Sequence, residues 1–290
     1  MPESSIGRKY GLKASLPDPR RHRFGLVGSP HKLPDRVVLD AVDTRVRDQG
    51  GLGAATACGA SSAVDIMNAK LAERDQGQLG CCVGEGTSGG THLDLLNADY
   101  KWPFTPSVLD IYYRCREKEG TVDQDAGAMI SDAFDVLRNQ GVCPEDSNPA
   151  WSWPFSSTDQ RWKDAPPDAC KQDALQHKIV KYAQIHQDPD SIKAALASGF
   201  PVVIGCLVYP SFESAPEGVI PMPSVLEKLQ GPLGGHCTFL WGYGNLDANH
   251  ADGRNSWTTS WGDRGNYHIP FGYLCDPNLT SDLWLCGVLT

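Results

Sequence analysis

Two segments near the end of the chain carry residue types that can cooperate in acid–base catalysis. His236 follows two glycines and precedes an apolar run, and Asn255 stands two residues before Trp257. A histidine accepts or donates a proton near neutral pH, and an amide side chain can hold its ring in one tautomer. A large apolar ring beside that hydrogen bond excludes water and strengthens it. Together these residues predict a general base with its orienting group, although each one alone is more typical of a turn or a core.

A third segment, residues 49–57, is expected to provide the nucleophile, but alanine stands at the decisive position. Gln49 and Gly50 open a glycine-rich turn, and Ala55 follows in the first turn of a helix expected over residues 54–73. The free N–H groups and the dipole at a helix N-terminus stabilise a thiolate. A cysteine at position 55 would therefore be activated, whereas alanine leaves this position without a nucleophile.

The order of these segments resembles that of the papain-like cysteine peptidases, the family that includes the cathepsins. In the family pattern the catalytic cysteine comes five residues after a Gln-Gly pair, with His and Asn more than about 100 residues downstream. Gln49, Ala55, His236 and Asn255 occur in that order. The resemblance covers about residues 33–290, and Ala55 is its main departure from the family pattern.

The resemblance implies a role for each of these residues. The side chain of Gln49 and the backbone N–H of residue 55 would donate to the oxyanion, His236 would be the base, and Asn255 would orient it. An extended peptide would bind in the cleft between two lobes, and no cofactor or metal would be needed. The positions expected to line the substrate are Gly127, Ala128, Val203, Cys237 and Trp257.

Alanine at position 55 leaves two interpretations open. In the first, an active cysteine endopeptidase carries an engineered Cys→Ala change that traps an inactive proform; the retained Gln, His and Asn favour this. In the second, the chain is a natural pseudoenzyme that binds peptides or partners. An acyl transferase of the transglutaminase kind would use Asp rather than Asn255 as the orienting group. Neither Cys58 nor Cys237 is expected to replace the missing nucleophile, since Cys58 lies roughly 4.5 Å farther along the helix axis.

The remaining elements predict an α+β, papain-like fold with a helical lobe followed by a lobe of strands. Residues 77–102, which are rich in glycine and include two cysteines, are expected to form a loop or an insertion. The other expected helices span residues 108–119, 128–140 and 191–197, and the expected strands include residues 37–39, 202–209, 237–241 and 266–269.

The first 32 residues are expected to form an extension to the peptidase domain of residues 33–290. They contain several prolines and basic residues without a clear hydrophobic period. Related enzymes are made as zymogens whose N-terminal segment blocks the cleft. The extension is therefore either a short pro-segment that lies across the cleft or a passive surface segment.

Composition places the chain among soluble globular proteins. It has 290 residues, 40% of them hydrophobic, and a net charge of −9. It has no apolar run long enough to span a membrane, no secretory signal in the chain as given, and no basic stripe for nucleic acid. A monomer is expected. The ten cysteines show no zinc-binding spacing and are expected to be mostly reduced, with one or two disulfides left open.

Overall fold

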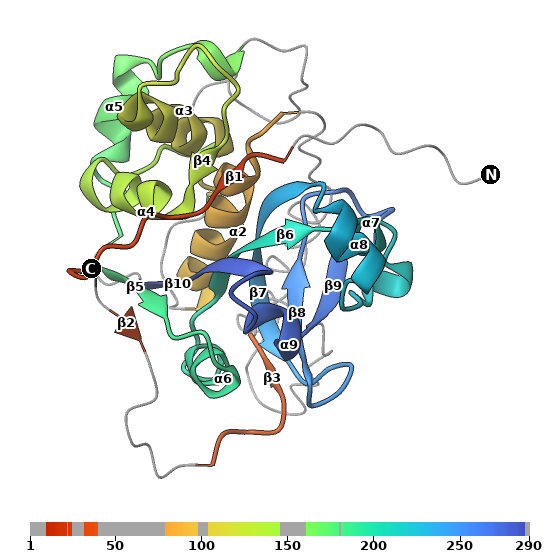
Figure 1. The fold of residues 1–290 in the computed structure, drawn as a ribbon. Coiled ribbons are helices and arrows are strands. Elements are labelled where there is room, and N and C mark those ends of the chain that lie inside the picture. The colour runs from red at the N-terminus through yellow and green to blue at the C-terminus, as the bar shows by residue number, and fades with distance from the viewer. Residues whose placement is uncertain are drawn as a thin grey trace.

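The chain folds into two lobes with one long helix between them. The computed structural model describes residues 10–21, 23–24, 32–39, 79–97, 104–145, 161–179 and 181–287. Helix α2 (Cys82–Asn97) runs through the centre, with helices on one side and a twisted sheet on the other (Figure 1). This is the papain-like α+β architecture expected from the sequence. The helix expected over residues 54–73 lies outside the described residues.

The helical lobe is built on two helices that confirm the sequence-based expectation. The Ser107 side chain caps the start of α3 (Val108–Glu119) by accepting the N–H of Asp110, and Gly120 ends it in the left-handed conformation at φ 71°. The second expected helix starts two residues late, because Ala128 and Met129 form a short strand. The elements of this lobe are α3, β4 (Ala128–Met129), α4 (Ile130–Asn139), a 3-10 turn η3 (Arg161–Lys163) and α5 (Asp168–Ala174).

The second lobe is a mostly antiparallel sheet with the strand order β2-β5-β10-β6-β7-β8-β9, and β3 pairs with β7. Between β6 and β7 the register sets Cys206 opposite His236 and Gly205 opposite Cys237. The expected strands and the helix expected over residues 191–197 are all present. The strands are β2 (Arg23–Phe24), β3 (Val37–Val38), β5 (Lys181–Ile185), β6 (Val202–Val208), β7 (Gly234–Tyr243), β8 (His250–Arg254), β9 (Asn266–Pro270) and β10 (Thr280–Gly287). The helices are α6 (Pro189–Ala197), α7 (Pro210–Glu213), η4 (Pro216–Gly218), α8 (Val225–Gln230) and α9 (Phe271–Leu274).

The expectation of a loop over residues 77–102 is wrong, because α2 occupies most of that range. Its glycines serve close packing of the helix on the sheet. A Cβ on Gly86 would lie 2.7 Å from the Cys237 sulfur, and one on Gly89 would lie 2.4 Å from the ring of Phe239. Tertiary packing therefore overrides the low helix propensity of glycine here.

Cysteine usage agrees with the expectation of mostly reduced thiols. Cys81, Cys82, Cys115, Cys206, Cys237 and Cys275 are free thiols, and all of these except Cys275 are buried. Cys58 and the side chain of Cys286 lie outside what the structure describes. Among the helices described, none combines the length and the apolar character needed to cross a membrane.

Candidate active site

The histidine and asparagine singled out in the sequence lie together at the edge of the sheet. His236 near the start of β7 is buried, and its Nε2 donates a hydrogen bond of 2.7 Å to Oδ1 of Asn255. Asn255 directly follows β8, and the same oxygen accepts the N–H of Ser256 at 2.8 Å. Because Nε2 is held by a carbonyl oxygen, Nδ1 is the ring nitrogen that would accept a proton.

Aromatic rings cover this hydrogen bond, as expected for Trp257. The buried indole of Trp257 stacks on the imidazole of His236 with ring centroids 4.7 Å apart and an interplanar angle of 24°. Phe212 and Trp261 pack against Trp257 at 5.9 Å and 5.0 Å. The rings separate the pair of His236 and Asn255 from water, which strengthens their hydrogen bond.

A thiol lies beside this pair at a position that the sequence analysis did not consider. Cys82 is the first residue of α2, and the backbone N–H of Cys237, the residue after His236, is directed at its sulfur. The N–H groups of Gly11 and Val83 also point at this sulfur and lower its pKa. Complete burial outweighs them and raises the pKa of the Cys82 thiol to about 11. Asp125 holds the approach to the helix by accepting the N–H of Gly80 at 3.0 Å.

The sequence contains a cue for Cys82 that was missed. Gln76 and Gly77 precede Cys82 with the same spacing that relates Gln49 and Gly50 to position 55. The glycines that follow Cys82 favoured a loop and drew attention away from this second occurrence. Gln49, Ala55 and Gln76 lie outside the described residues. Of the two candidate nucleophile positions, 55 and 82, the structure therefore describes only Cys82.

The N-terminal segment (residues 10–15) occupies the cleft between the lobes and passes over Cys82. Strand β1 (Leu12–Lys13) pairs in parallel with β4, and the N–H of Ala128 donates to the carbonyl of Gly11 at 2.8 Å. Only glycine fits at position 11, because a Cβ there would lie 1.8 Å from the carbonyl oxygen of Gly80. In Figure 1, β1 crosses in front of α2 between the two lobes.

Both ends of this segment are anchored. The Tyr10 ring meets those of His236 and Trp257 edge-on, each at 6.3 Å, and its hydroxyl donates to Glu213 of α7. Lys13 pairs with Glu119 at the end of α3. Tyr10 therefore fastens the segment to the sheet lobe, and Lys13 fastens it to the helical lobe.

Leu12 marks a depression in the cleft floor. Its side chain lies over Gly205, where a Cβ would come within 2.9 Å of Leu12 Cδ2 and 3.0 Å of both Ile130 and Asp282. Asp282 is buried, and its Oδ2 accepts the N–H of Ser15 at 3.2 Å. The absence of a side chain at Gly205 creates space for one leucine-sized group.

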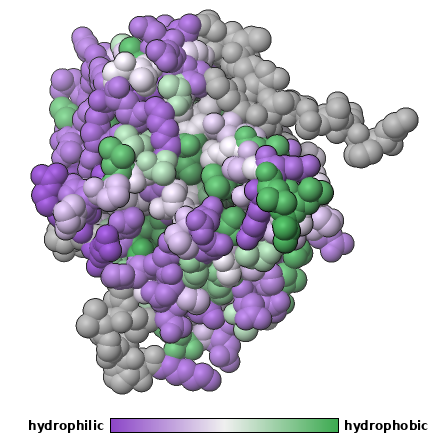
Figure 2. All heavy atoms as spheres, viewed as in Figure 1, coloured by the Kyte–Doolittle hydropathy of each residue, from purple (hydrophilic) through white to green (hydrophobic). Residues whose placement is uncertain are grey.

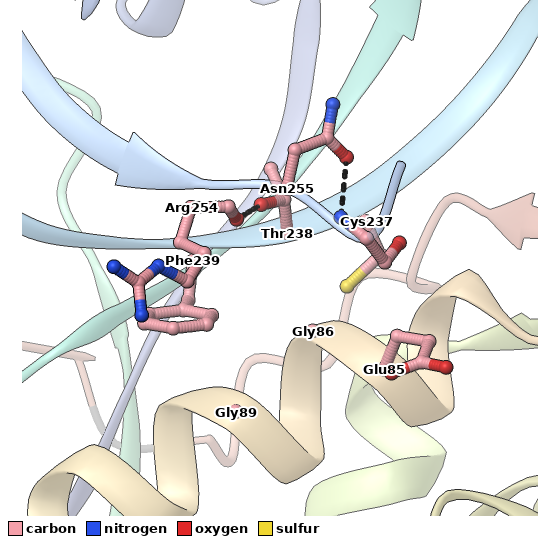
Figure 3. Close-up of a pocket in the computed structure, with 9 residues that line it drawn as sticks. Glu85, Gly86, Gly89, Cys237, Thr238, Phe239, Arg254 and Asn255 are labelled. Carbon is pink, nitrogen blue, oxygen red and sulfur yellow. Dashed lines mark hydrogen bonds between the residues drawn. The ribbon is translucent and has the colours of Figure 1, made fainter. Parts of the chain in front are cut away.

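The residues expected to line the substrate take different places. Gly127 and Ala128 lie against the backbone of Gly11. Val203 is buried against Gly90 of α2. Cys237 is also buried, and Figure 3 shows its sulfur directed toward α2 near Gly86, at a small cavity that reaches Asn255.

Comparison with known proteins shows the family. The sequence profile described as papain family cysteine protease matches residues 71–276, which include Cys82, His236 and Asn255 but not Ala55. The chain therefore belongs to the papain family of cysteine proteases. It is 33% identical over 231 residues to a peptidase C1-like protein of Acanthamoeba polyphaga mimivirus, covering 76% of this chain and 71% of the viral protein. Cathepsin B of Dictyostelium discoideum is 28% identical over 169 residues, about half of either chain.

Solved structures agree with this assignment. Xylellain, a cysteine protease from Xylella fastidiosa, superposes with a TM-score of 0.75 at 29% identity and covers 98% of both chains. Procathepsin B S9 from Trypanosoma congolense superposes with a TM-score of 0.66 over 98% of this chain and 88% of its own. At 15% identity, the second likeness shows the fold alone.

Proposed function

We propose that this chain is an active cysteine endopeptidase whose nucleophile is Cys82, with His236 as the base and Asn255 as its orienting group. The position of Cys82 carries the proposal: it is the first residue of α2, and α2 packs against β7, the strand that contains His236. The match to the family profile, which begins at residue 71, supports the same choice. We therefore prefer an active enzyme that uses Cys82 to an enzyme inactivated, by engineering or naturally, through alanine at position 55.

The proposed reaction uses these groups in sequence. Nδ1 of His236 takes the proton of the Cys82 thiol, and the thiolate attacks the carbonyl carbon of the scissile peptide. His236 then gives this proton to the leaving nitrogen as the C–N bond breaks, which leaves a thioester. Water, deprotonated by His236, attacks the thioester carbon and releases the acid with cleavage of the C–S bond. The backbone N–H of Cys82 and the side chain of Gln76 are proposed as oxyanion donors.

The N-terminal segment supports a second part of the proposal, namely that residues 1–32 form a pro-segment. Gly11 lies against Gly80, two residues before Cys82, and its backbone N–H is near enough to the Cys82 sulfur to lower the pKa of this thiol. The Gly11 carbonyl is already engaged by Ala128. The segment therefore occupies the place of a substrate without offering a bond for attack, and the peptidase would be latent until this segment leaves.

Substitutions at the two candidate positions test the function directly. The unsubstituted chain, Cys82→Ala, Ala55→Cys and His236→Ala would be compared on fluorogenic peptides from acidic to neutral pH, with and without a thiol alkylator. Each would be assayed before and after the N-terminal segment is removed by brief trypsin treatment, with the trypsin then inhibited. Once the segment is removed, we expect the unsubstituted chain to show alkylator-sensitive cleavage, and Cys82→Ala and His236→Ala to lose about 10⁴-fold in rate or more. Ala55→Cys should change nothing. Cleavage that appears only in Ala55→Cys would restore position 55 as the nucleophile, and no cleavage by any form would favour a binding protein.

A further inference from the structure

An exposed apolar surface adjoins the cleft on the sheet lobe. Of the eight exposed large apolar side chains in the described part of the chain, five fall between residues 222 and 233. Val225 is 76% exposed and Leu229 is 80% exposed, and α8 has no buried residue. Figure 2 shows the apolar surface around α8 on the visible face. We call this surface the α8 patch; it consists of Met222, Val225, Leu226, Leu229 and Leu233.

Polar contacts, not burial of its apolar side chains, hold α8 in place. Ser224 and Glu227 form a reciprocal cap at its start. Glu227 also accepts the N–H of Ser211 in α7 at 2.8 Å. The helix is therefore fixed while its leucines face solvent, which is the opposite of the usual orientation of a surface helix. Clustered exposed apolar side chains of this kind mark a binding surface.

The α8 patch adjoins the part of the cleft that holds Tyr10. Leu233 precedes Gly234, where a Cβ would lie 2.4 Å from Cβ of Tyr10. The Tyr10 hydroxyl binds Glu213 at the end of α7, the helix that anchors α8 through Ser211. An extended chain that leaves the place of Tyr10 in this direction reaches the rim of the patch within about two to four residues, at roughly 3.3 Å per residue.

The proposed chemistry fixes which part of a substrate lies there. His236 protonates the leaving nitrogen, so the chain attached to that nitrogen lies on the His236 side of Cys82. Tyr10 occupies that side, whereas Leu12 occupies the side of β4 and Gly205. The leaving part of the substrate would therefore follow the cleft toward α8.

We propose that the α8 patch binds bulky apolar side chains of polypeptide substrates, a few residues to the C-terminal side of the scissile bond. This inference rests on the proposed peptidase function. The α8 patch would make the enzyme selective for extended or unfolded polypeptides with apolar clusters, because such side chains are accessible there. Short substrates without a chain beyond the scissile bond would not reach the patch.

Two substrate types separate this selectivity from catalysis itself. The chain, opened by brief trypsin treatment that removes the N-terminal segment and is then stopped with an inhibitor, would be assayed with a short acyl-peptide that carries a fluorogenic amine. It would also be assayed with internally quenched peptides that continue for six residues beyond the same bond. In one quenched peptide these residues include leucine and phenylalanine, and in the other they are replaced by serine. The ratio of kcat/KM values within one preparation is independent of the fraction of molecules with an open cleft.

We expect the leucine-containing peptide to be preferred about tenfold over the serine peptide, and Leu226→Ser/Leu229→Ser to abolish this preference. The double variant should cleave the short substrate as before. Leu175→Ser and Leu246→Ser are matched controls, because these leucines are 46% and 44% exposed elsewhere, and they should retain the preference.

Other results overturn the inference. If the short substrate is cleaved but the preference is absent or survives in the double variant, the inference fails while the peptidase function stands. If neither substrate is cleaved, the proposed function fails and the inference falls with it. Vesicles of phosphatidylcholine and sedimentation velocity test two other occupants. Membrane binding or dimerisation lost in the double variant would assign the α8 patch to that occupant instead.

Discussion

At the scale of single residues, the environment of Cys82 opposes the state that catalysis needs. A peptidase requires a thiolate, yet burial beneath the N-terminal segment raises the pKa of Cys82 to about 11. The backbone N–H groups around the sulfur act in the other direction. The site is therefore arranged to favour a thiolate once water or substrate replaces the covering segment.

This conflict predicts the pH dependence of alkylation. In the full chain, labelling of Cys82 by iodoacetamide should rise about tenfold per pH unit between pH 7 and 10, because only the thiolate reacts. Gly11→Ala, which places a Cβ against Gly80, should displace the segment and shift this profile to lower pH. Mass spectrometry of the labelled peptide provides the rates, with Leu16→Ala as a control on an exposed side chain of the extension. A rate already constant above pH 7 in the full chain would contradict this reading.

A second residue-scale prediction concerns stability. Nδ1 of His268 lies 2.6 Å from Oδ1 of the buried Asp252, and this hydrogen bond raises the pKa of His268, with smaller contributions from Asp263 and Asp247. A histidine whose folded pKa is raised stabilises the protein below its unfolded value of about 6.5, and this stabilisation is lost as pH rises through the folded pKa.

The melting temperature should therefore decline from pH 6 toward pH 8, and this decline should be smaller in His268→Gln. Thermal unfolding measures the difference between the two proteins, and a Cys82→Ala background would prevent the self-digestion that the proposed function implies. His250→Gln is a useful comparison, because that histidine pairs with the exposed Asp247. An identical pH dependence in the unsubstituted protein and His268→Gln would refute the assignment.

At the scale of elements, α2 contains glycines although glycine is a poor helix former, because the sheet packs against the helix too closely for larger side chains. Gly89 leaves room for the ring of Phe239, as Gly86 does for Cys237. This close contact sets the N-terminus of α2, and with it Cys82, against β7. A larger side chain would move Cys82, the proposed nucleophile, away from His236.

Gly89→Ala should therefore destabilise the protein although alanine is the better helix former. We expect the free energy of unfolding to fall by about 1–3 kcal/mol, because the added methyl group overpacks the contact with Phe239. Gly272→Ala is the matched control: it lies in α9, is exposed, and meets only a Met222 sulfur at 3.8 Å. That control should be neutral or stabilising by up to about 1 kcal/mol. Urea unfolding measures both, and equal effects would argue against the packing explanation.

The same helix marks the limit of what the sequence could predict. Helices α3 and α4 were predictable because burial of one helix face leaves apolar residues at helical spacing in the sequence. Strand β6 was predictable from its short continuous run of apolar residues. His236 and Asn255 were predictable from their types and order. The residues of α2 after Cys82 include several glycines instead of apolar residues at helical spacing, because this helix packs closely against the sheet. Of the two segments with equal spacing after a Gln-Gly pair, only the second has a cysteine at the nucleophile position, and the glycines after Cys82 concealed the helix that this residue begins.

At the scale of the whole molecule, the N-terminal segment joins the two lobes. Tyr10 contacts the sheet lobe, Lys13 pairs with the helical lobe, and Leu12 fills the depression at Gly205 between them. The segment therefore contributes to the packing of the lobes on each other as well as covering Cys82.

Removal of residues 1–31 should lower stability while it uncovers the site. Loss of the Leu12 contact alone is worth about 2 kcal/mol, which corresponds to a fall in melting temperature of roughly 4–8 °C. Calorimetry of the truncated and full chains, both carrying Cys82→Ala, tests this. Removal of residues 1–9 alone, which retains Tyr10 through Ser15, should have a smaller effect. An unchanged melting temperature after the larger truncation would show that the segment does not support the lobes.

The covalent attachment of residues 10–15 has a consequence for how the proposed latency would end. While the segment is part of the chain, its local concentration at the cleft is of millimolar order and does not change when the protein is diluted. A single break in the backbone after this segment converts the blockade into an ordinary bimolecular equilibrium, and the released peptide then competes only at its bulk concentration. In dilute solution, one cut would therefore make the opening of the cleft effectively irreversible, because the released segment would rebind too rarely to block the cleft again.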